Sequence, residues 1–404
     1  MTQTFSKGIL LLTIILMDLL AGMEFDLFSP SFPELQAHFC LTPFWVEALL
    51  SVNFIGYCLS LFFVGSLADR YGRKVIIVIG LLIFIISSFL CLSSPSYSIL
   101  LFGRFFQGAG IAAPAILSFL IIADSYPLKK QQSLFAILNG IMNASVGVAP
   151  VIGSYVSLYF HWQGTFITLL LFGVVTLLMT LIFIPHTKAP EHREPFSIRE
   201  YLPIFKSKSL VLLILKMVFS WTPYWIFVGM SPLLYMEALG VSLSHFGYYQ
   251  GALASVFALG SLFFGLIINR YNQKKMLYSS NYLLIVGLIC ITIITFLNSS
   301  NALLITVSFI PYIIAGVIPS TLLYPICLNF MPKAKGRVSA TLRGTHLILS
   351  ALSLQLAGYF YRGSFQNIGI IISGFIVLSV ITLFLILKNQ EIMRFFEEKN
   401  GNFS

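Results

Sequence analysis

Three carboxylic acids, Asp18, Glu24 and Asp26, lie in a segment that is otherwise apolar enough to cross a membrane. A charge in the bilayer interior is costly, so a buried carboxyl there must be paired with a cation or neutralised by a proton. Such a group can bind a proton from one side of a membrane and release it when a cation approaches. Asp18 and Asp26 are eight residues apart, about 80° around a helix and about 12 Å along it, so both can face one cavity. The pattern therefore predicts proton-binding side chains inside a membrane helix.

The three acids are not equivalent. Glu24 lies about 200° from Asp26 around the same helix, so the two cannot share one narrow face. We expect Asp26 to be the main proton-coupling residue and Asp18 to bind substrate or a second proton. Glu24 is either a further proton-coupling residue or a structural partner for a cation on another helix. Pro30 cannot donate a hydrogen bond to the carbonyl of Asp26, which leaves a weak point in the helix.

Three cations, Arg104, Lys216 and Arg343, also lie within apolar runs. Inserting an arginine or lysine at the centre of a membrane helix costs about 2.5–3.5 kcal/mol, so these side chains are not expected to face lipid. Arg104 is either a partner of the proton-carrying acids or a brace to backbone carbonyls. Lys216 and Arg343, if they face a cavity, predict a substrate with a carboxylate or phosphate. Arg343 can alternatively extend to the membrane surface.

Other candidates to line a substrate cavity are aromatic and amide side chains inside the expected spans: Tyr224, Trp225, Asn53, Asn139, Asn143 and Gln250. The aromatic pair can instead form an interfacial belt or pack in the core. No metal or cofactor is expected, because the six histidines show no ligand spacing and the five cysteines no paired spacing. The chain also lacks a G-x-x-x-x-G-K-[ST] loop, which argues against ATP as the driving force.

The elements that position these residues are membrane helices. Of the 404 residues, 58% are hydrophobic and 9% are charged, whereas soluble domains have roughly 25% charged residues. A bilayer requires about 20 apolar residues per helix. Twelve such runs are expected, at 8–31, 45–67, 75–94, 98–122, 133–158, 164–185, 209–235, 244–268, 276–298, 302–329, 338–361 and 367–388. The first run is too long and too acidic for a cleavable signal peptide.

The distribution of basic residues predicts the orientation of the chain. Twenty of the 24 lysines and arginines lie in alternate loops and in the two tails, whereas the intervening loops hold only Arg362. This is the positive-inside pattern, and it places both termini and the loop 186–208 in the cytoplasm. The net charge of +10 is therefore explained by membrane topology, and no nucleic-acid partner is expected.

The chain also divides into two similar parts. The only long polar connection, 186–208, separates six expected helices at 1–185 from six at 209–404. GSLADRYGRK at 65–74 matches GLIINRYNQK at 265–274 at four positions, each after the second helix of its half. Paired halves of six helices with a binding site between them are a transporter design.

Three motifs extend this interpretation. GSLADRYGRK contains Gly65, Asp69, Arg70, Gly72 and Arg73 and resembles the signature loop of the major facilitator superfamily, which implies close helix approach at Gly65 and a cytoplasmic gate formed by the charged residues. RFFQGAG at 104–110 begins with Arg104. GVAPVIGSYV at 147–156 contains Gly147, Pro150 and Gly153, which would allow a bend in the fifth helix.

These three motifs, together with Asp26 followed by a proline four residues later, resemble the major facilitator superfamily. The resemblance is to its drug:proton antiporter branch, in the subgroup similar to bicyclomycin and chloramphenicol resistance transporters. It implies an all-α membrane fold of twelve transmembrane helices in two pseudo-symmetric halves. Ala149 and Ser154 depart from the glycines usual in the fifth-helix motif, and this weakens the implied direction of transport without affecting the fold.

The expected function is secondary active transport by alternating access, coupled to protons, in the inner membrane of a bacterium. We expect a monomer that exports small lipophilic or zwitterionic compounds. The alternative is a proton-driven importer or exporter of an acidic metabolite, such as a carboxylate-type siderophore, which Lys216 and Arg343 would favour. A membrane-embedded enzyme would need a nucleophile beside a base, and a sensor would need an added soluble domain; neither is expected.

Overall fold

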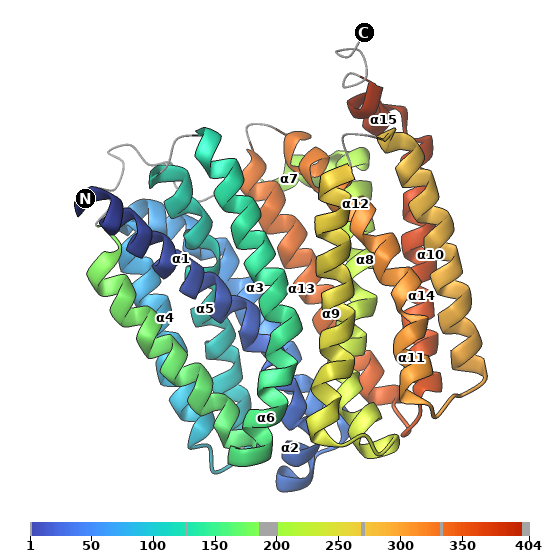
Figure 1. Ribbon diagram of the computed structural model, residues 1–404, viewed down its shortest axis with the longest axis horizontal. Helices are drawn as coiled ribbons and strands as arrows, with labels where there is room; N and C mark the ends of the chain where they lie inside the picture. The colour runs from blue at the N-terminus through green and yellow to red at the C-terminus, as the bar shows by residue number, and fades with distance from the viewer. Residues whose placement is uncertain (1, 126–127, 186–200, 268–270, 332–333, 398–404) are drawn as a thin grey trace. The chain divides into compact units, whose positions relative to one another are not determined.

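In a computed structural model, residues 2–125, 128–185, 201–267, 271–331 and 334–397 are described, and these segments form helices without any strand. The helices belong to two compact units (Figure 1). Unit 1 comprises Met1–Phe196 together with Ser242–Gly251, and unit 2 comprises Ser197–Val241 and Ala252–Ser404. The division after Phe196 falls within the connection expected at 186–208. The assignment of Ser242–Gly251 to unit 1 was not expected from the sequence.

Unit 1 is built from long apolar helices. They are α1 (Thr2–Asp26), the 3-10 turn η1 (Ser29–Ser31), α2 (Phe32–Phe39), α3 (Pro43–Tyr71), α4 (Arg73–Leu92), α5 (Tyr97–Ser125) and α6 (Leu128–Phe183), with the first residues of α9 (Leu243–Ile267). Helix α5 packs on both α3 and α4, and α1 packs on α6. This arrangement surrounds the inner faces of α1 and α5 with protein, which is where the expected acids and Arg104 lie.

The first membrane helix ends earlier than expected. Helix α1 ends at Asp26, and the chain continues through η1 into α2. Pro30 has no N–H to donate to the carbonyl of Asp26, and the Ser29 hydroxyl donates to that carbonyl instead, at 3.1 Å. The weak point predicted at Pro30 is thus a helix end at which a side chain replaces the missing backbone hydrogen bond.

Helix α6 contains the fifth and sixth expected spans. They are separated by a kink at His161, whose φ of 59° lies in the left-handed region. The Nδ1 atom of His161 lies 3.0 Å from a carboxylate oxygen of Glu34 on α2, in an exposed hydrogen-bonded contact. This contact connects the kink with the segment that follows α1.

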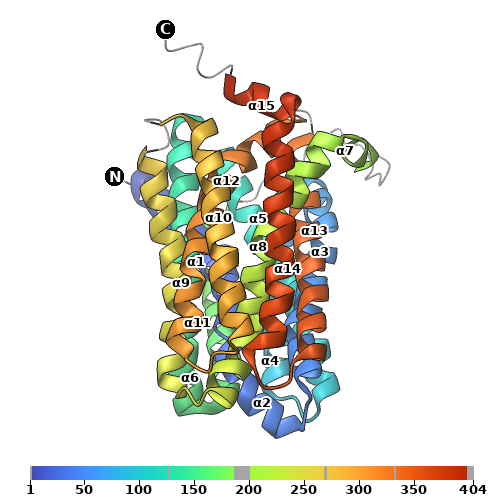
Figure 2. The ribbon, with the colours of Figure 1, turned by 90° about the vertical axis from the view of Figure 1, so that its right-hand side faces the viewer.

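Unit 2 contains the remaining helices. They are α7 (Leu202–Lys206), α8 (Lys208–Pro232), the π-helical turn η3 (Leu233–Ala238), the rest of α9, α10 (Gln273–Phe296), α11 (Ala302–Ser308), α12 (Ile310–Asn329), α13 (Lys335–Phe360), α14 (Phe365–Lys388) and α15 (Gln390–Glu397). Helix α8 packs on α13 and α14, and α10 packs on α12 and α14. The short helices α7 and α15 lie at the same end of this unit (Figure 2).

The helices account for all the expected membrane spans. Among the described residues, nine helical segments are long and apolar enough to cross a bilayer, one of which is Ala144–Phe183 in α6. The first part of α6, together with α9 and α13, covers the three further spans expected at 133–158, 244–268 and 338–361. The two matched sequences at 65–74 and 265–274 also hold equivalent places, because one joins α3 to α4 and the other joins α9 to α10.

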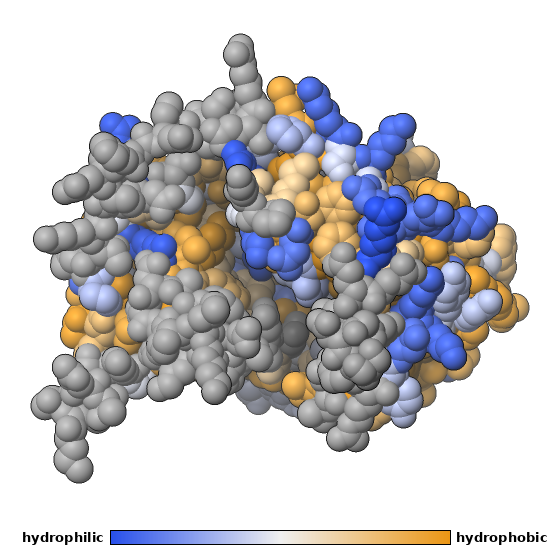
Figure 3. Space-filling view, turned by 90° about the horizontal axis from the view of Figure 1, so that it is seen from above, coloured by the Kyte–Doolittle hydropathy of each residue, from blue (hydrophilic) through white to orange (hydrophobic). Residues whose placement is uncertain are grey.

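Hydrophilic side chains gather at the end of unit 2 that carries α15 (Figure 3). Lys274, Lys388 and Arg394 line one pocket there. Half of the residues of α15 are polar, and its residues Ile392, Met393 and Phe396 are buried in the core of unit 2. A helix with one polar and one apolar face is expected to pack its apolar face against the protein core, as α15 does.

Candidate functional site

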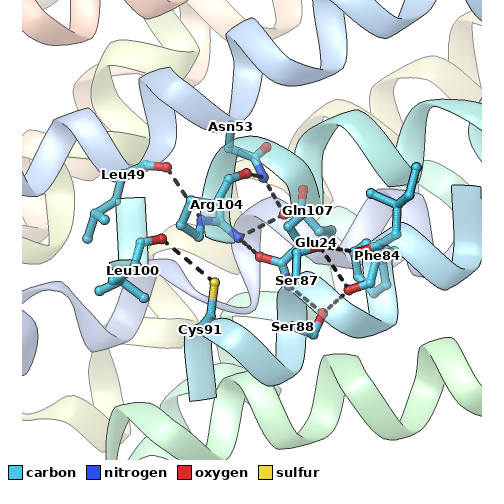
Figure 4. A network of polar contacts seen from close by, with 11 residues as sticks. Glu24, Leu49, Asn53, Phe84, Ser87, Ser88, Cys91, Leu100, Arg104 and Gln107 are labelled. Carbon is cyan, nitrogen blue, oxygen red and sulfur yellow. Dashed lines mark hydrogen bonds and ion pairs between the residues drawn. The ribbon is translucent and has the colours of Figure 1, made fainter. Parts of the chain in front are cut away.

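A buried ion pair joins two helices of unit 1. The guanidinium Nη1 of Arg104 on α5 lies 2.8 Å from Oε1 of Glu24 on α1, and both side chains are fully buried (Figure 4). The same carboxylate oxygen accepts a hydrogen bond of 2.7 Å from the amide of Asn53 on α3. The Asn53 amide also donates to the backbone carbonyl of Arg104 at 3.0 Å. Three helices thus meet at one carboxylate.

The guanidinium of Arg104 has further contacts through Nη1, Nε and its flat face, while its Nη2 has no hydrogen-bond partner within the described segments. Its Nη1 donates to the Gln107 side chain at 2.5 Å, and its Nε donates to the carbonyl of Leu49 at 3.4 Å. The aromatic ring of Phe28 lies 4.5 Å from the guanidinium carbon, which adds a cation–π contact. The Gln107 amide in turn donates to the Ser88 hydroxyl of α4 at 2.8 Å. A cation with this many partners remains charged inside the protein.

Glycines allow the helices to approach closely enough for this network. A Cβ atom at Gly108 of α5 would lie 2.1 Å from the carbonyl oxygen of Asn53, and one at Gly56 of α3 would lie 2.1 Å from that of Phe105. Real side chains do not tolerate such distances. The spacing of α3 and α5 therefore depends on the absence of side chains at these two positions.

The carboxyl of Asp26 is also buried, but its neighbour is the amide of Gln250 and not a cation. Its Oδ1 accepts a hydrogen bond of 3.2 Å from the amide of Gln250, at the beginning of α9. The amide oxygen of Gln250 lies 3.1 Å from the Ser29 hydroxyl, whose single proton is shared between this oxygen and the carbonyl of Asp26. The other oxygen of Asp26 has no hydrogen-bond partner within the described segments. Asp26 thus has a neutral amide beside it, in contrast to the cation beside Glu24.

The motif at 147–156 in α6 packs against the start of α9 and so places Gln250 beside Asp26. A Cβ atom at Gly251 would lie 2.5 Å from the carbonyl of Gly147, and one at Gly247 would lie 2.7 Å from that of Pro150. Gly153 is in similarly close contact with the backbone of Leu27, the residue after Asp26. The small residues of α6 therefore hold the end of α1 and the start of α9 against one helix surface.

Asp18, the third acid of α1, is also buried, with 1% of its surface exposed. It is engaged in an interaction of its own. Asn139 and Asn143 were further candidates in unit 1, but their side chains lie outside the described part of the chain. Asn53 and Gln250 are the two candidate amides that the structure brings to acids.

The lysine of unit 2 is bound within its own unit. The ammonium of Lys216 on α8 is buried and donates to the hydroxyl of Ser379 on α14 at 2.7 Å, and to its carbonyl at 3.2 Å. Ser220 shares the Ser379 hydroxyl at 2.9 Å. The described residues provide no carboxylate for Lys216.

The other candidates of unit 2 are only partly buried. Tyr224 and Trp225 on α8 have ring centroids 6.2 Å apart, and Trp225 lies 6.5 Å from the ring of His346 on α13. Arg343 on α13 is also half-buried and has an interaction of its own. Trp225 and Lys216 are both on α8, but Trp225 contacts α13 and Lys216 contacts α14.

The motif at 65–74 forms the junction of α3 and α4. Gly72 has a φ of 92°, a conformation that favours glycine. A Cβ atom at Gly65 would meet no atom of the described residues within 4 Å, so the close helix approach expected there stays a prediction. Arg70 is exposed and lies over the ring of Tyr71, whereas Arg73 is half-buried with an interaction of its own. The side chain of Asp69 lies outside the described part of the chain.

Sequence reasoning missed three polar residues. Gln107 lies in the quoted motif RFFQGAG, and its place beside Arg104 was available from the helical spacing of three residues. Ser88 carried no signal, because isolated serines are common in membrane helices. Glu47 lies inside the second expected span and could have been recognised as a fourth membrane acid; it is fully buried.

The arrangement places two buried carboxyls of α1 in different surroundings. Among the described residues, no group of three or more potential metal ligands comes together. Glu24 has a permanent cation beside it, so its charge is compensated. Asp26 is hydrogen-bonded to a neutral amide, so a proton of its own can compensate its burial.

Comparisons with known proteins agree with this description. The chain is 25% identical over 377 residues to the multidrug resistance protein MdtL of Salmonella heidelberg, covering 91% of this chain and 92% of the relative. It is 27% identical over 253 residues to a bicyclomycin resistance protein homolog of Haemophilus influenzae, covering 62% of this chain and 64% of that one.

Solved structures give the same fold. A D-xylose–proton symporter matches with a TM-score of 0.74 at 13% identity, covering 94% of this chain and 97% of the symporter. A bacterial homolog of the human lysosomal transporter Spinster matches with a TM-score of 0.71 at 16% identity, covering 94% and 96%. These similarities confirm the predicted all-α fold of twelve membrane helices. A family model described as the Major Facilitator Superfamily matches residues 14–352, and the chain therefore belongs to the major facilitator superfamily of membrane transporters.

Proposed function

We propose that this transporter exports small lipophilic or zwitterionic compounds in exchange for protons. The observation that carries the proposal is the environment of Asp26, which is fully buried and receives one hydrogen bond from the neutral amide of Gln250. A carboxyl in that environment is neutral when protonated and unstable when ionised without a cation. The names of its relatives, which refer to multidrug and bicyclomycin resistance, support an exported substrate.

In the proposed cycle, one proton and one substrate compete for the Asp26 region. The proton binds the carboxylate from the outer side, and its release to the inner side follows substrate binding. A bound substrate with positive charge stabilises the ionised carboxylate and so favours release of the proton. Because substrate moves outward while protons move inward, the proton gradient drives export.

Glu24 and Arg104 have a different role in this proposal. Their buried ion pair, with Asn53 and Gln107, fixes α1 against α3 and α5 and thereby positions Asp26 at the end of α1. A substrate that competed for Arg104 would have to replace three hydrogen-bond acceptors and a ring contact. We therefore assign proton coupling to Asp26 first, with Glu24 and Arg104 as positioning residues.

The proposed location is the inner membrane of a bacterium, with both termini in the cytoplasm, and the proposed active form is a monomer. The support is the distribution of lysine and arginine in alternate loops. The alternative substrate class, an acidic metabolite such as a carboxylate-type siderophore, would need an available cation. Lys216 is hydrogen-bonded to Ser379 instead, so this alternative has less support.

Transport assays with purified protein in liposomes test the proposal. We expect an imposed pH gradient to drive the movement of ethidium or bicyclomycin, and not of citrate. Asp26→Asn, which keeps the size of the side chain, should abolish gradient-driven movement. Glu34→Gln, which removes an exposed carboxyl of the same unit, serves as the control and should transport normally. Full activity in Asp26→Asn, or movement of citrate alone, contradicts the proposal.

A further inference from the structure

Glu47 is a buried carboxyl without a described partner. It lies on α3, four residues after the first residue Pro43, and none of its surface is exposed. Neither of its carboxylate oxygens has a hydrogen-bond partner in the segments that the structure describes. An ionised carboxylate in such a place would lose its hydration without compensation, at a cost that real proteins avoid by protonating the group. Glu47 therefore carries a proton in this conformation.

No neighbouring side chain supplies a countercharge for Glu47 within the described segments. The titratable and charged residues of α3 and of the elements that contact it in unit 1 are Lys7, Asp18, Glu24 and Asp26 on α1; Glu34 and His38 on α2; Tyr57, Cys58, Asp69, Arg70 and Tyr71 on α3; Arg73, Lys74 and Cys91 on α4; and Tyr97, Arg104 and Asp124 on α5. Lys7 has its side chain outside the described part, forty residues before Glu47 in the chain. Asp69 and Asp124 have side chains outside the described part.

The described cations in this set are engaged elsewhere. Arg104 is bound to Glu24, and Lys74 donates to the carbonyl of Leu181. Arg70 and Arg73 lie at the opposite end of α3, more than twenty residues and so about 34 Å along the helix from Glu47. His38 is exposed, with its ring against Phe39 and Trp162.

Glu47 is also separate from the ion-pair network. Asn53, which binds Glu24, is six residues further along α3, which corresponds to about 9 Å of rise and about 120° of rotation. Phe54, on the same helix face as Glu47, packs its ring 4.9 Å from that of Phe25 on α1. At the other side, Thr42 immediately before α3 is exposed. Glu47 is therefore within about 8 Å, along the helix, of a position that water reaches.

We propose that Glu47 is a second proton-binding site of the transport cycle, distinct from the carboxyls of α1. In the present conformation it is protonated. When the cycle opens the first turns of α3 to water, the carboxylic acid transfers its proton to water and becomes a hydrated carboxylate, and it takes up a proton again when this region closes. This inference rests on the proposed proton-driven export. It adds a proton to the cycle that Asp26 alone would not carry.

A simpler interpretation is that Glu47 stays protonated at all times and only fills space. The two interpretations differ in whether Glu47 changes its protonation state during transport. Glu47→Gln separates them, because glutamine has the size of protonated glutamic acid and cannot release a proton. Glu47→Asp keeps a titratable carboxyl, and Glu34→Gln removes an exposed carboxyl of the same unit as a control.

The first experiment is infrared spectroscopy of the purified full-length protein in lipid at neutral pH. We expect a carbonyl stretching band of protonated carboxylic acid that is weaker in Glu47→Gln than in the wild type and unchanged in Glu34→Gln. An identical band in the wild type and in Glu47→Gln overturns the proposal, because Glu47 would then be ionised. This measurement does not depend on any transported substrate.

The second experiment measures proton stoichiometry in liposomes with the membrane potential held at zero. For a fixed gradient of ethidium, the pH difference that stops net dye movement is inversely proportional to the number of protons exchanged. We expect this pH difference to rise in Glu47→Gln, twofold if two protons fall to one, and to stay at the wild-type value in Glu47→Asp and Glu34→Gln. If Glu47→Gln needs the same pH difference as the wild type to stop net dye movement, the proposal is overturned, whereas proton-driven export is not. Wild-type protein that moves neither ethidium nor bicyclomycin contradicts the proposed function itself.

Discussion

Arg104 and Glu24 form a fully buried ion pair with a separation of 2.8 Å between Nη1 and Oε1, while Asp26, two residues further along α1, has a neutral amide as its partner. Neighbouring acids on one helix therefore have opposite electrostatic surroundings. The first faces the guanidinium of Arg104, and the second is the carboxyl for which we propose proton binding and release. This difference leads to predictions that can be tested separately.

The ion pair should show strong energetic coupling. Breaking a buried pair from one side leaves an uncompensated charge and costs about 3–5 kcal/mol, whereas removing both charges costs much less. We expect Glu24→Gln and Arg104→Gln each to lower the thermal unfolding temperature in detergent, and the double variant to be more stable than Arg104→Gln alone. The measurement is a double-mutant cycle, in which the unfolding temperatures of the wild type, the two single variants and the double variant are compared.

A second double-mutant cycle on the exposed contact between Glu34 and His161 serves as the comparison. Their atoms are 3.0 Å apart, but the His161 side chain is 77% exposed, so water screens the interaction and the coupling should be small. Additive effects of Glu24→Gln and Arg104→Gln would show that the buried pair does not hold α1 to α5.

Removing the amide of Gln250 should impair transport. Gln250→Leu deprives Asp26 of its hydrogen-bond donor, and hydrogen bonds to charged groups contribute about 1.5–3 kcal/mol. We expect proton-driven ethidium movement to fall about tenfold or more. Tyr248→Phe is a matched control on the same helix, since it removes only the exposed hydroxyl contact with Tyr155. Equal transport rates in both variants would show that Gln250 does not act on Asp26.

Adding a methyl group at Gly108 should separate α3 from α5. The new Cβ atom would lie 2.1 Å from the carbonyl oxygen of Asn53, and forced overpacking costs about 1–3 kcal/mol. Gly108→Ala should therefore lower the unfolding temperature. Gly316→Ala on α12 is the control, because its Cβ atom would meet nothing within 4 Å and alanine has the higher helix propensity. The opposite order of stabilities would contradict the close contact.

Replacing Lys216 should not destabilise the protein. Lys216→Met keeps the length of the side chain and removes a buried amino group that has no carboxylate partner among the described residues, a change that is often neutral or stabilising. Ser379→Ala removes one acceptor of this amino group, and this should cost about 1–3 kcal/mol. Unfolding temperatures of the two variants check this order. A Lys216→Met protein that is stable but has lost citrate movement shown by the wild type would instead support the acidic-metabolite alternative.

Much of unit 1 could be predicted from the order of residues along the chain. Hydropathy identifies the spans, and the cost of a buried arginine requires Arg104 to find a partner in the protein. The choice of Glu24 as that partner could not be predicted, because it depends on the rotation and spacing of α1, α3 and α5. Close contacts at Gly56 and Gly108 set that spacing, and a sequence motif does not reveal which backbone atoms they touch.

Contacts between distant residues are a second limit of sequence reasoning. Gln250 and Asp26 are 224 positions apart, and Lys216 and Ser379 are 163 apart. Gln250 could be recognised as a polar residue in an apolar helix, but not as a member of unit 1. Lys216 could be recognised as costly in a membrane, while the serine that satisfies it has no distinguishing pattern.

The placement of Ser242–Gly251 in unit 1 has a consequence for production of the protein as fragments. If the chain is divided at the connection 186–208, the amino-terminal fragment lacks Gln250, which binds Asp26. It also lacks Gly247 and Gly251, which pack against α6. Neither fragment would then be self-sufficient, although each would contain six hydrophobic segments. When the two fragments are co-expressed, Gln250 of the second fragment must bind Asp26 of the first before the proposed proton coupling can occur.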